Sequence, residues 1–367
     1  MSWSPQQERA LKAVAVWLKD PHAPQVFYLA GFAGTGKTTL AKEMASSVSG
    51  LVLFGAFTGK AALVLQNKGC IGASTIHSMI YQPRRRKGGV TEWILDPDGP
   101  VKEAALVVID EVSMVGRDLG EDLLSYGKKV LVLGDPAQLP PVNGEGYFTA
   151  RRPDVMLTEV HRQAQDNPII RMSMDVREGR GLAFGQYGSS KVIPTSRVDR
   201  DEVLASDQVL VGINKSRRLY NDRIRSLRGF KGTAPMVGER LVCLRNKRQK
   251  GLLNGGLWTV IDLIEVDPDF IKMVVDPADA GAVKQPTEVQ VHPYFFTGRD
   301  KELSVADLKH SDQFDFGYAL TVHKSQGSQW NNVYLFDESG AFRSDHTKWL
   351  YTGVTRAAEA VTIARAS

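Results

Sequence analysis

The chain has 367 residues, of which 43% are hydrophobic and 24% charged. This is the composition of a folded protein with room for two or three domains. The net charge of +5 is a mild basic excess, which suits a polyanionic partner without requiring one. No run of about 18 apolar residues occurs, so a membrane span is not expected.

The chain start reads as a capped amphipathic helix. Ser4 is placed to cap it and Pro5 lies in its first turn. A basic segment followed by an apolar one, as in a secretion signal, is absent, which indicates a cytoplasmic protein. Cys70 and Cys243 lie far apart without a CxxC neighbour. We expect two small buried hydrophobic residues and neither a zinc site nor a disulfide.

Short apolar, β-branched runs alternate with helical stretches along most of the chain. A first series covers residues 25–30, 51–57, 105–110 and 130–134, and a second covers 208–213, 318–322, 332–336 and 360–364. Such runs are typical of buried parallel strands. The predicted fold class is therefore α/β with two parallel sheets.

Two stretches interrupt that alternation. Residues 81–100 contain a Lys-Gly-Gly turn between extended arms, which indicates a protruding β-hairpin, with a surface loop as the alternative. Residues 235–309 contain strand-like runs at 239–245, 257–266 and 271–276, joined by turns and without a long helix. A small β-barrel inserted into the second α/β domain is the prediction for this part.

Residues 31–38 (GFAGTGKT) match the phosphate-binding pattern G-x-x-x-x-G-K-[ST]. The match follows a predicted strand and opens a helix predicted at residues 39–46. Glycines let backbone N–H groups surround phosphates, and the helix N-terminus adds partial positive charge. Lys37 is expected to reach the terminal phosphates and Thr38 to offer its hydroxyl to Mg²⁺. A glycine-rich turn without a ligand is the alternative.

A buried strand ends in Asp110 and Glu111. Because ligands bind at the carboxyl ends of parallel strands, we expect Asp110 beside Mg²⁺ and Glu111 near the attacking water as general base. A kinase needs no such base, so the glutamate favours hydrolysis over transfer. Together with the preceding pattern, the pair indicates ATP hydrolysis with Mg²⁺.

At this point the chain resembles superfamily 1 helicases, specifically the RecD/Dda-like group. The resemblance rests on motifs in the family's order, which cover residues 31–38, 57–62, 74–78, 110–114, 133–142, 157–163, 318–330 and 351–357. It implies two RecA-like P-loop NTPase domains, a hairpin pin and an SH3-like barrel. The implied boundaries are 1–80 and 101–155 for the first domain, 81–100 for the pin, 156–234 and 311–367 for the second domain, and 235–310 for the barrel.

The resemblance also implies nucleotide-site residues. Gln7 is expected to read adenine, with Gln6 as the alternative, and Gln138 to sense the γ-phosphate. Arg162 and Arg356 would be arginine fingers, with surface salt bridges as the alternative. The full implied set of nucleotide contacts is Gln7, Gly31, Ala33, Gly34, Thr35, Gly36, Lys37, Thr38, Thr39 and Gly327. Lys37, Glu111, Gln138, Arg162 and Arg356 are the expected catalytic residues, and Thr38 and Asp110 the metal ligands.

Motifs that line the DNA channel in relatives supply the expected nucleic-acid contacts: Thr58, Lys60, Thr75, His77, Trp93, Asn214, His323 and Lys324. Such side chains suit phosphate contacts, which position a strand without reading its sequence. Core histidines are the alternative for His77 and His323, a helix cap for Asn214, and a buried anchor for Trp93. Trp93 would otherwise stack on a base at the fork.

The predicted function is that of an ATP-dependent DNA helicase moving 5′→3′ on single-stranded DNA. The alternatives are a translocase that walks without unwinding and an accessory motor subunit of a recombination or repair nuclease complex. A P-loop kinase or GTPase is disfavoured, because it would explain neither Gln138 and Arg356 nor the second sheet. The expected partners are single-stranded and fork DNA, with a single-strand-binding protein or replication and recombination proteins as candidates. A compact, phage-type monomer is the expectation from size.

Overall fold

The computed structural model describes residues 3–85, 91–141, 144–159, 167–278 and 285–367. Its described residues group into two compact units. One comprises Met1–Phe57 and Ala61–Arg171, and the other Thr58–Lys60 and Met172–Ser367.

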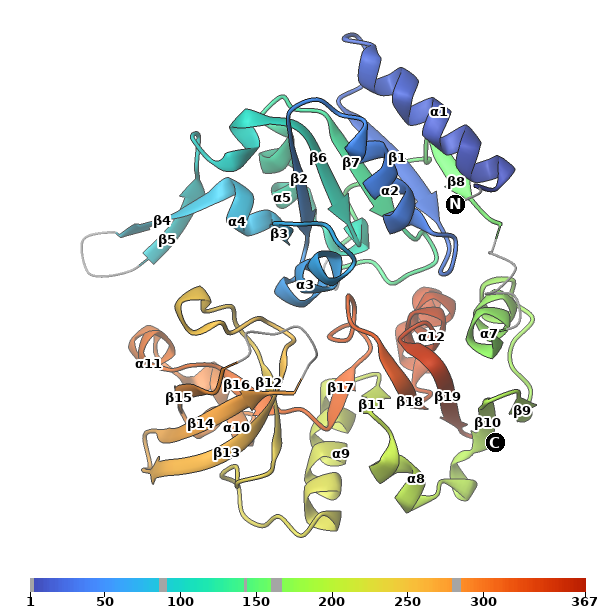
Figure 1. The fold of residues 1–367 in the computed structure, drawn as a ribbon. Helices are drawn as coiled ribbons and strands as arrows, with labels where there is room; N and C mark the ends of the chain where they lie inside the picture. Colours follow the sequence, from blue (N-terminus) through green and yellow to red (C-terminus); the bar gives the residue numbers. More distant parts are fainter. Residues whose placement is uncertain (1–2, 86–90, 142–143, 160–166, 279–284) are drawn as a thin grey trace. The chain divides into compact units, whose positions relative to one another are not determined.

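The first unit is built on a parallel sheet. Its strands are β1 (Val26–Gly31), β2 (Leu51–Ala56), β3 (Ser74–Thr75), β6 (Ala104–Asp110), β7 (Val130–Gly134) and β8 (Val155–Leu157). Their spatial order is β3-β2-β6-β7-β1-β8 (Figure 1), and every described pairing is parallel. All six residues of β1 are buried, which explains why this strand is an uninterrupted apolar run.

Helices cover both faces of this sheet. They are α1 (Pro5–Lys19), α2 (Lys37–Ser46), α3 (Gly59–Asn67), α4 (Ile76–Ile80) and α5 (Arg117–Leu124). One core contains apolar side chains of α1 and α2 with Leu29, Leu106 and Leu131 of the sheet. The other contains side chains of α4 and α5 with Val107 and Ile109. Alternate residues of the same strand therefore face opposite helical layers.

The predicted cap of the first helix is present. Ser4 is the N-cap of α1, and its hydroxyl accepts a hydrogen bond from Gln7 N at 3.4 Å. The Gln7 side chain in turn accepts one from Ser4 N at 3.0 Å, which completes a capping box. Pro5 occupies the first turn, where its missing N–H costs no helical bond. These three residues explain where α1 begins.

The predicted hairpin is present in the first unit. Strands β4 (Tyr81–Arg85) and β5 (Thr91–Leu95) pair antiparallel and project from the helical layer beside the sheet (Figure 1). The Tyr81 hydroxyl donates to Asp122, and the Tyr126 hydroxyl lies within hydrogen-bond distance of the carbonyl oxygens of Ile80 and Asp96. The base of the hairpin is thus attached to α5 and the turn that follows it, while the Lys-Gly-Gly turn lies outside the described residues.

The first unit continues past the boundary expected at residue 155. Strand β8 pairs with β1, so that Gly31 lies beside Leu157, and the unit extends to Arg171. Strand β8 was not predicted from the sequence, because a three-residue strand shows no periodicity. Pairing with β1 therefore places Leu157 in the first sheet.

The second unit contains another α/β sheet. Its strands are β9 (Gly185–Tyr187), β10 (Ser190–Pro194), β11 (Gln208–Val211), β17 (Ala319–Thr321), β18 (Trp330–Phe336) and β19 (Ala357–Arg365). Their order is β17-β11-β18-β19-β10-β9, and only the edge pair β9–β10 is antiparallel among the described pairings. The accompanying helices are α7 (Pro168–Arg177), α8 (Arg200–Ala205), α9 (Asn214–Leu227) and α12 (His346–Val354).

A five-stranded antiparallel sheet is inserted into this unit. It consists of β12 (Arg240–Cys243), β13 (Leu257–Val266), β14 (Ile271–Pro277), β15 (Thr287–Val291) and β16 (Phe314–Phe316), with the short helices α10 (Tyr294–Thr297) and α11 (Val305–His310). The order is β15-β14-β13-β12-β16, so the sheet extends beyond the predicted limit of residue 310. Its resemblance to an SH3-like domain stays a prediction.

The inserted sheet and the second α/β sheet share one apolar core. Trp258 and Phe314 of the insertion belong to the same buried cluster as Val209 and Tyr334 of the α/β sheet. Cys243 lies in that cluster and Cys70 is buried in the first unit, so both cysteines are buried as predicted. Short 3₁₀ helices complete the described structure: η1 (Pro100–Glu103), η2 (Val112–Met114), η3 (Thr195–Arg197), η4 (Arg248–Lys250), η5 (Asp300–Glu302) and η6 (Ser339–Asp345).

No helix within the described ranges has the length and apolarity that crossing a lipid bilayer demands.

Candidate nucleotide site and nucleic-acid contacts

The phosphate-binding pattern lies between β1 and α2, as predicted. Gly34 and Gly36 have φ values of 79° and 80°, which side-chain-bearing residues rarely adopt. A Cβ atom on Gly31 would lie 2.6 Å from Thr35 Oγ1, so glycine is needed there for a different reason, the close approach of the loop. The sequence folds this way because β1 ends at Gly31 and α2 begins at Lys37.

Lys37 reaches back over the loop that precedes it. Its Nζ donates to Gly31 O at 2.6 Å and to Phe32 O at 3.1 Å. The ammonium therefore lies beside the first residues of the loop. A phosphate held by the loop N–H groups would find this cation within the same turn.

Thr38 and Asp110 meet across the sheet, although 72 positions separate them. Thr38 Oγ1 donates to Asp110 Oδ2 at 2.8 Å, and Glu111 N donates to Asp110 Oδ1 at 2.8 Å. A hydroxyl and a carboxylate are oxygen ligands of the kind that Mg²⁺ prefers, with water and substrate phosphates completing the shell. The residues present therefore fit a magnesium ion. The described residues contain no cluster of three or more His, Cys, Asp or Glu side chains that could hold a metal ion.

Glu111 has an unusual backbone. Its φ of 54° and ψ of 45° lie in the left-handed region, and Arg343 is the other non-glycine residue with positive φ in the described chain. This conformation turns the chain sharply between β6 and η2, directly after the metal-ligand candidate. Strained backbone of this kind costs about 1–3 kcal/mol and is concentrated at functional sites.

The two N-terminal glutamines have different contacts. Gln7 Nε2 donates to Thr35 O in the phosphate loop at 3.2 Å. Gln6 Oε1 accepts from Thr158 N at 2.8 Å and Glu159 N at 3.0 Å, and its Nε2 donates to Thr158 Oγ1 at 2.9 Å. Gln7 thus contacts the phosphate loop, and Gln6 connects α1 to the residues that follow β8. The assignment of adenine recognition to Gln7, with Gln6 as the alternative, stays a prediction.

The remaining nucleotide candidates lie in separate places. Gln138 lies in the turn after β7 in the first unit, where its N–H donates to Asp135 O at 3.1 Å. Gly327 (φ 75°) and Arg356 lie in the second unit. Arg356 donates to Thr352 O at 3.0 Å and Ser328 O at 3.2 Å and makes no salt bridge within the described chain. Arg162 lies outside the described residues.

Nucleic-acid candidates of the first unit have mixed surroundings. The Thr75 hydroxyl caps α4 by accepting from Ser78 N at 3.3 Å. His77 is an exposed residue, and its ring centroid lies 6.3 Å from that of Phe57 and 5.4 Å from that of Tyr81. Trp93 is 58% exposed on β5 and pairs with Pro83, so it is not the buried anchor that was its alternative.

The predicted nucleic-acid contacts of the second unit include Thr58 and Lys60, because residues Thr58–Lys60 group with that unit. Asn214 opens α9 without capping it, because Ile213 is the N-cap and Asn214 Oδ1 accepts from Arg217 Nε at 3.2 Å. The His323 ring lies 5.4 Å from that of Phe342, and burial lowers its imidazole pKa. The surroundings of His323 are therefore compatible with both alternatives, a DNA contact and a core histidine.

Lys324 has a partner that the sequence did not reveal. Its Nζ donates to Asn254 Oδ1 at 2.8 Å, and burial lowers the pKa of the ammonium. Asn254 lies in the inserted sheet's turn, 70 positions away, and no motif marks it. Its hydrogen bond to the predicted DNA contact Lys324 links the insertion to the second α/β sheet. This partner of Lys324 could be identified only from the fold.

Together these features define the class. The first unit is a P-loop nucleotide-binding domain, and a second α/β unit with a β insertion follows it. The chain belongs to the family described as an AAA domain, which matches residues 2–197, and residues 316–364 match the UvrD-like helicase C-terminal domain. The resemblance to superfamily 1 helicases of the RecD/Dda-like group is confirmed.

Curated relatives support this placement. The chain is 30% identical to an ATP-dependent RecD2 DNA helicase of Deinococcus radiodurans, over 90% of its own length and 45% of that protein. It is 24% identical to a probable conjugal transfer protein TraA of Sinorhizobium fredii, over 90% of its length and 30% of TraA. The chain therefore spans less than half of these two relatives. An ATP-dependent DNA helicase Pif1 of Bdellovibrio bacteriovorus is 24% identical over 84% of this chain and 77% of that protein.

Solved structures share the fold. Pif1 helicase from Bacteroides in complex with ADP-AlF3 and ssDNA superposes with a TM-score of 0.57 at 17% identity, covering 99% of this chain and 92% of that one. Pif1 helicase from Candida albicans gives 0.54 at 18% identity, covering 99% and 95%. At such identities the likeness concerns the fold, and it confirms the predicted two-domain α/β architecture.

Proposed function

We propose that this chain is an ATP-dependent DNA helicase that moves along single-stranded DNA and separates duplexes. The observation that carries the proposal is the meeting of Thr38, Asp110 and Glu111 at the end of β6, beside a complete phosphate loop. The similarity to RecD2 over 90% of this chain supports extending that ATPase site to a helicase.

The proposed chemistry is hydrolysis of ATP. Water attacks the γ-phosphorus, the bond to the β–γ bridging oxygen breaks, and the attacking water gives its proton to Glu111. Lys37 and the loop N–H groups hold the phosphates, while Gln138, Arg162 and Arg356 complement the charge of the transition state. Thr38 and Asp110 would hold Mg²⁺, whose chemistry is to neutralise charge on the β- and γ-phosphate oxygens.

The proposed nucleic-acid partners are single-stranded and fork DNA, contacted without sequence preference. An exposed Trp93 on an anchored hairpin supports unwinding in addition to walking, because a base could stack on it where the duplex opens. The 5′→3′ polarity, the monomeric state, the protein partners, the cytoplasmic location and the phage origin stay predictions.

Strand displacement on forks tests the proposal. Duplexes with a single 5′ tail or a single 3′ tail are offered with ATP and Mg²⁺, and release of the labelled strand is followed. We expect release from the 5′-tailed fork and none with the Lys37→Ala variant. Release from the 3′-tailed fork alone would overturn the polarity, and no release from either would overturn the helicase proposal.

A further inference from the structure

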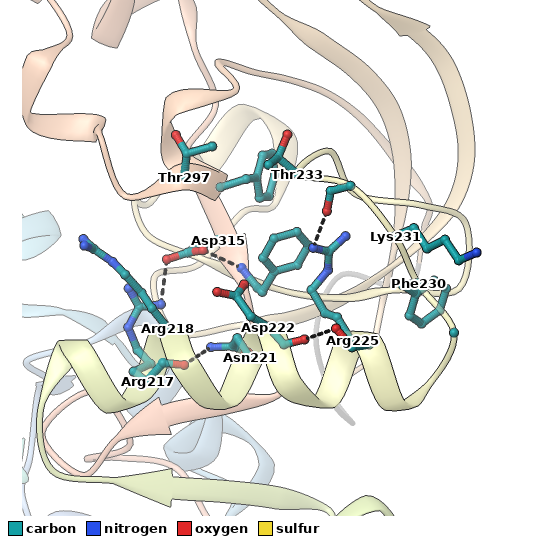
Figure 2. A pocket seen from close by; sticks show the side chains of 15 residues that line it. Arg217, Arg218, Asn221, Asp222, Arg225, Phe230, Lys231, Thr233, Thr297 and Asp315 are labelled. Carbon is teal, nitrogen blue, oxygen red and sulfur yellow. Dashed lines mark hydrogen bonds and ion pairs between the residues drawn. The ribbon is translucent and has the colours of Figure 1, made fainter.

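A pocket of about 660 Å³ lies in the second unit. Two of its lining residues contact predicted motif residues, since Arg217 donates to Asn214 and Asn221 to Ala319 O. The pocket is bounded by one side of α9, the chain at residues 229–233, α10 and β16 (Figure 2). The lining residues of α9 recur at three- and four-residue spacing from Arg217 to Ser226, so the pocket follows the helix axis. At 1.5 Å per residue, the helical stretch from Arg217 to Ser226 is about 14 Å long.

The lining is basic and aromatic. Arg217, Arg218, Arg225 and Lys231 line it, against the acidic Asp222 and Asp315. Phe230, Phe296 and Phe316 contribute aromatic rings, and Ser226, Thr233 and Thr297 contribute hydroxyls. A site with cations, hydroxyl groups and an aromatic ring has the chemistry that binds phosphates and stacks bases.

Two of the four cations are committed to structural partners. Arg217 Nη1 donates to Asp315 at 2.6 Å. Arg225 forms a bidentate pair with Glu239, at 2.6 and 2.9 Å, and lies 3.8 Å above the Phe316 ring. These pairs join α9 to the insertion and leave little charge for a ligand.

The other two cations, Arg218 and Lys231, make no hydrogen bond or ion pair with any described residue. Figure 2 shows them at opposite ends of the pocket. Arg218 is exposed, and its guanidinium lies close to Gly298, where an added Cβ atom would lie 2.4 Å from Arg218 Cζ. The guanidinium thus packs on a glycine backbone, with its hydrogen-bonding edges unused within the described structure.

We propose that this pocket is a further binding site for the phosphate backbone of a nucleic-acid strand, in addition to the contacts predicted from the motifs. The inference rests on the proposed nucleic-acid function. Cations at both ends of an elongated site suit a ligand with repeated negative charges, such as the phosphate backbone of a single strand. Half-buried Phe230, next to Lys231, is placed to stack on a base.

The test is strand binding by the Arg218→Gln/Lys231→Gln double variant, followed by fluorescence anisotropy against salt. Oligothymidylates of about 8 and about 40 nucleotides are compared, because sites for single strands take roughly 4–16 nucleotides. For the long strand we expect Kd to rise about tenfold and the slope of log K against log salt to flatten by about 1.4. The double variant should bind the short strand with the affinity of the unaltered protein, and the short strand should stimulate ATP turnover equally in both.

Two single variants make the test specific to charge in the pocket. Asp222→Asn removes a carboxylate from the lining and should tighten binding of the long strand. Arg223→Gln removes an exposed cation of the same helix that does not line the pocket, and should change little. Equal effects of Arg223→Gln and the double variant would contradict the proposal.

The remaining outcomes identify what the pocket binds. Unchanged long-strand binding by the double variant overturns the inference but leaves the proposed function intact, whereas an unaltered protein that binds neither strand overturns both. If the double variant no longer bound a labelled hexaglutamate peptide but still bound the long strand normally, the pocket would be assigned to an acidic protein partner instead. Inorganic phosphate is also compared with chloride at equal ionic strength as a competitor of the long strand. If phosphate displaced the strand more strongly than chloride, the pocket would be assigned to a free phosphate group.

Discussion

At Glu111 the backbone leaves β6 in the left-handed region, and its N–H donates to the carboxylate of Asp110. The positive φ of Glu111 turns the chain sharply, and this hydrogen bond holds one oxygen of the Asp110 carboxylate. Asp110 turns toward Thr38 and the phosphate loop, while Glu111 follows at the sharp bend. This arrangement fits one metal ligand and one general base. Two consecutive residues in an extended strand would instead place their side chains on opposite faces of the sheet.

The Glu111→Gln variant tests the base. Glutamine keeps the size of the side chain but accepts no proton at neutral pH, so single-turnover hydrolysis should slow by about 10²–10⁴-fold. The affinity for ATP, measured by equilibrium binding, should change little. Glu103→Gln, an exposed acid in the same unit, serves as the control. Normal hydrolysis by Glu111→Gln would remove Glu111 from the chemistry.

His323 connects a predicted DNA contact to stability. Burial lowers its pKa, while the nearby Asp345 acts in the opposite direction. The unfolded chain, with an ordinary histidine pKa of about 6.5, therefore binds the proton more readily than the folded one. The free energy of unfolding should fall as the pH drops below about 6.5, toward the lower folded pKa.

The comparison of His323→Gln with the unaltered chain measures this effect. Urea unfolding at pH 7.5 and pH 5.5 should show a smaller loss of stability at low pH in the variant. His310→Gln, which removes an exposed histidine, should keep the full loss. A pH dependence that His323→Gln leaves unchanged would show that its imidazole is not responsible.

At the scale of elements, the hairpin β4–β5 is fixed at its base and exposed along its strands. Tyr81 and Tyr126 attach the base, and Arg84 pairs with Glu92 across the strands at 3.3 Å. Such a surface ion pair contributes at most about 1 kcal/mol. The attachment at the base, rather than this pair, therefore determines where Trp93 is held.

Trp93→Ala should slow unwinding of a forked duplex while ATP turnover on single strands stays normal. Loss of one stacking contact costs about 1–3 kcal/mol. Trp93→Phe keeps an aromatic face and should retain most of the unwinding. Both variants are compared by strand displacement and by single-strand-stimulated ATPase. Equal unwinding by Trp93→Ala and the unaltered protein would exclude stacking by this ring.

Arg225 and Glu239 join α9 to the entry of the inserted sheet. The pair is almost fully buried, and Glu239 also accepts from Met236 N at 2.9 Å. Removing one member of a buried pair leaves an uncompensated charge, so Glu239→Ala should lower the free energy of unfolding by about 3–5 kcal/mol. Glu265→Ala, at an exposed position of β13, should change it little in the same urea titration. A similar small loss for both variants would contradict this account of the junction.

Much of this architecture could be predicted from sequence, because buried parallel strands are apolar runs and the phosphate loop has a strict pattern. The bounds of β7 and β13 match their predictions. Strand β16 was missed because it is three residues long and pairs with β12 some 70 positions earlier. The contacts of Gln6 with Thr158 and of Lys324 with Asn254 were missed for the same physical reason, since long-range pairing leaves no local signal.

At the scale of the whole molecule, the candidate groups are divided between two units. The phosphate loop and the Asp110–Glu111 pair belong to the first, and Arg356, His323 and Lys324 belong to the second. If both sets serve one reaction, ATP hydrolysis and strand binding must influence each other. By linkage, the strand then favours the state in which the catalytic groups are assembled.

ATP turnover with and without a single strand measures that coupling most directly. The full chain is assayed with ATP and Mg²⁺ while oligothymidylate is titrated from zero to saturation. We expect turnover to rise severalfold or more with the strand, and we expect the Lys37→Ala variant to show no turnover in either condition. Equal turnover at every strand concentration would contradict the claim that this ATPase drives movement along nucleic acid.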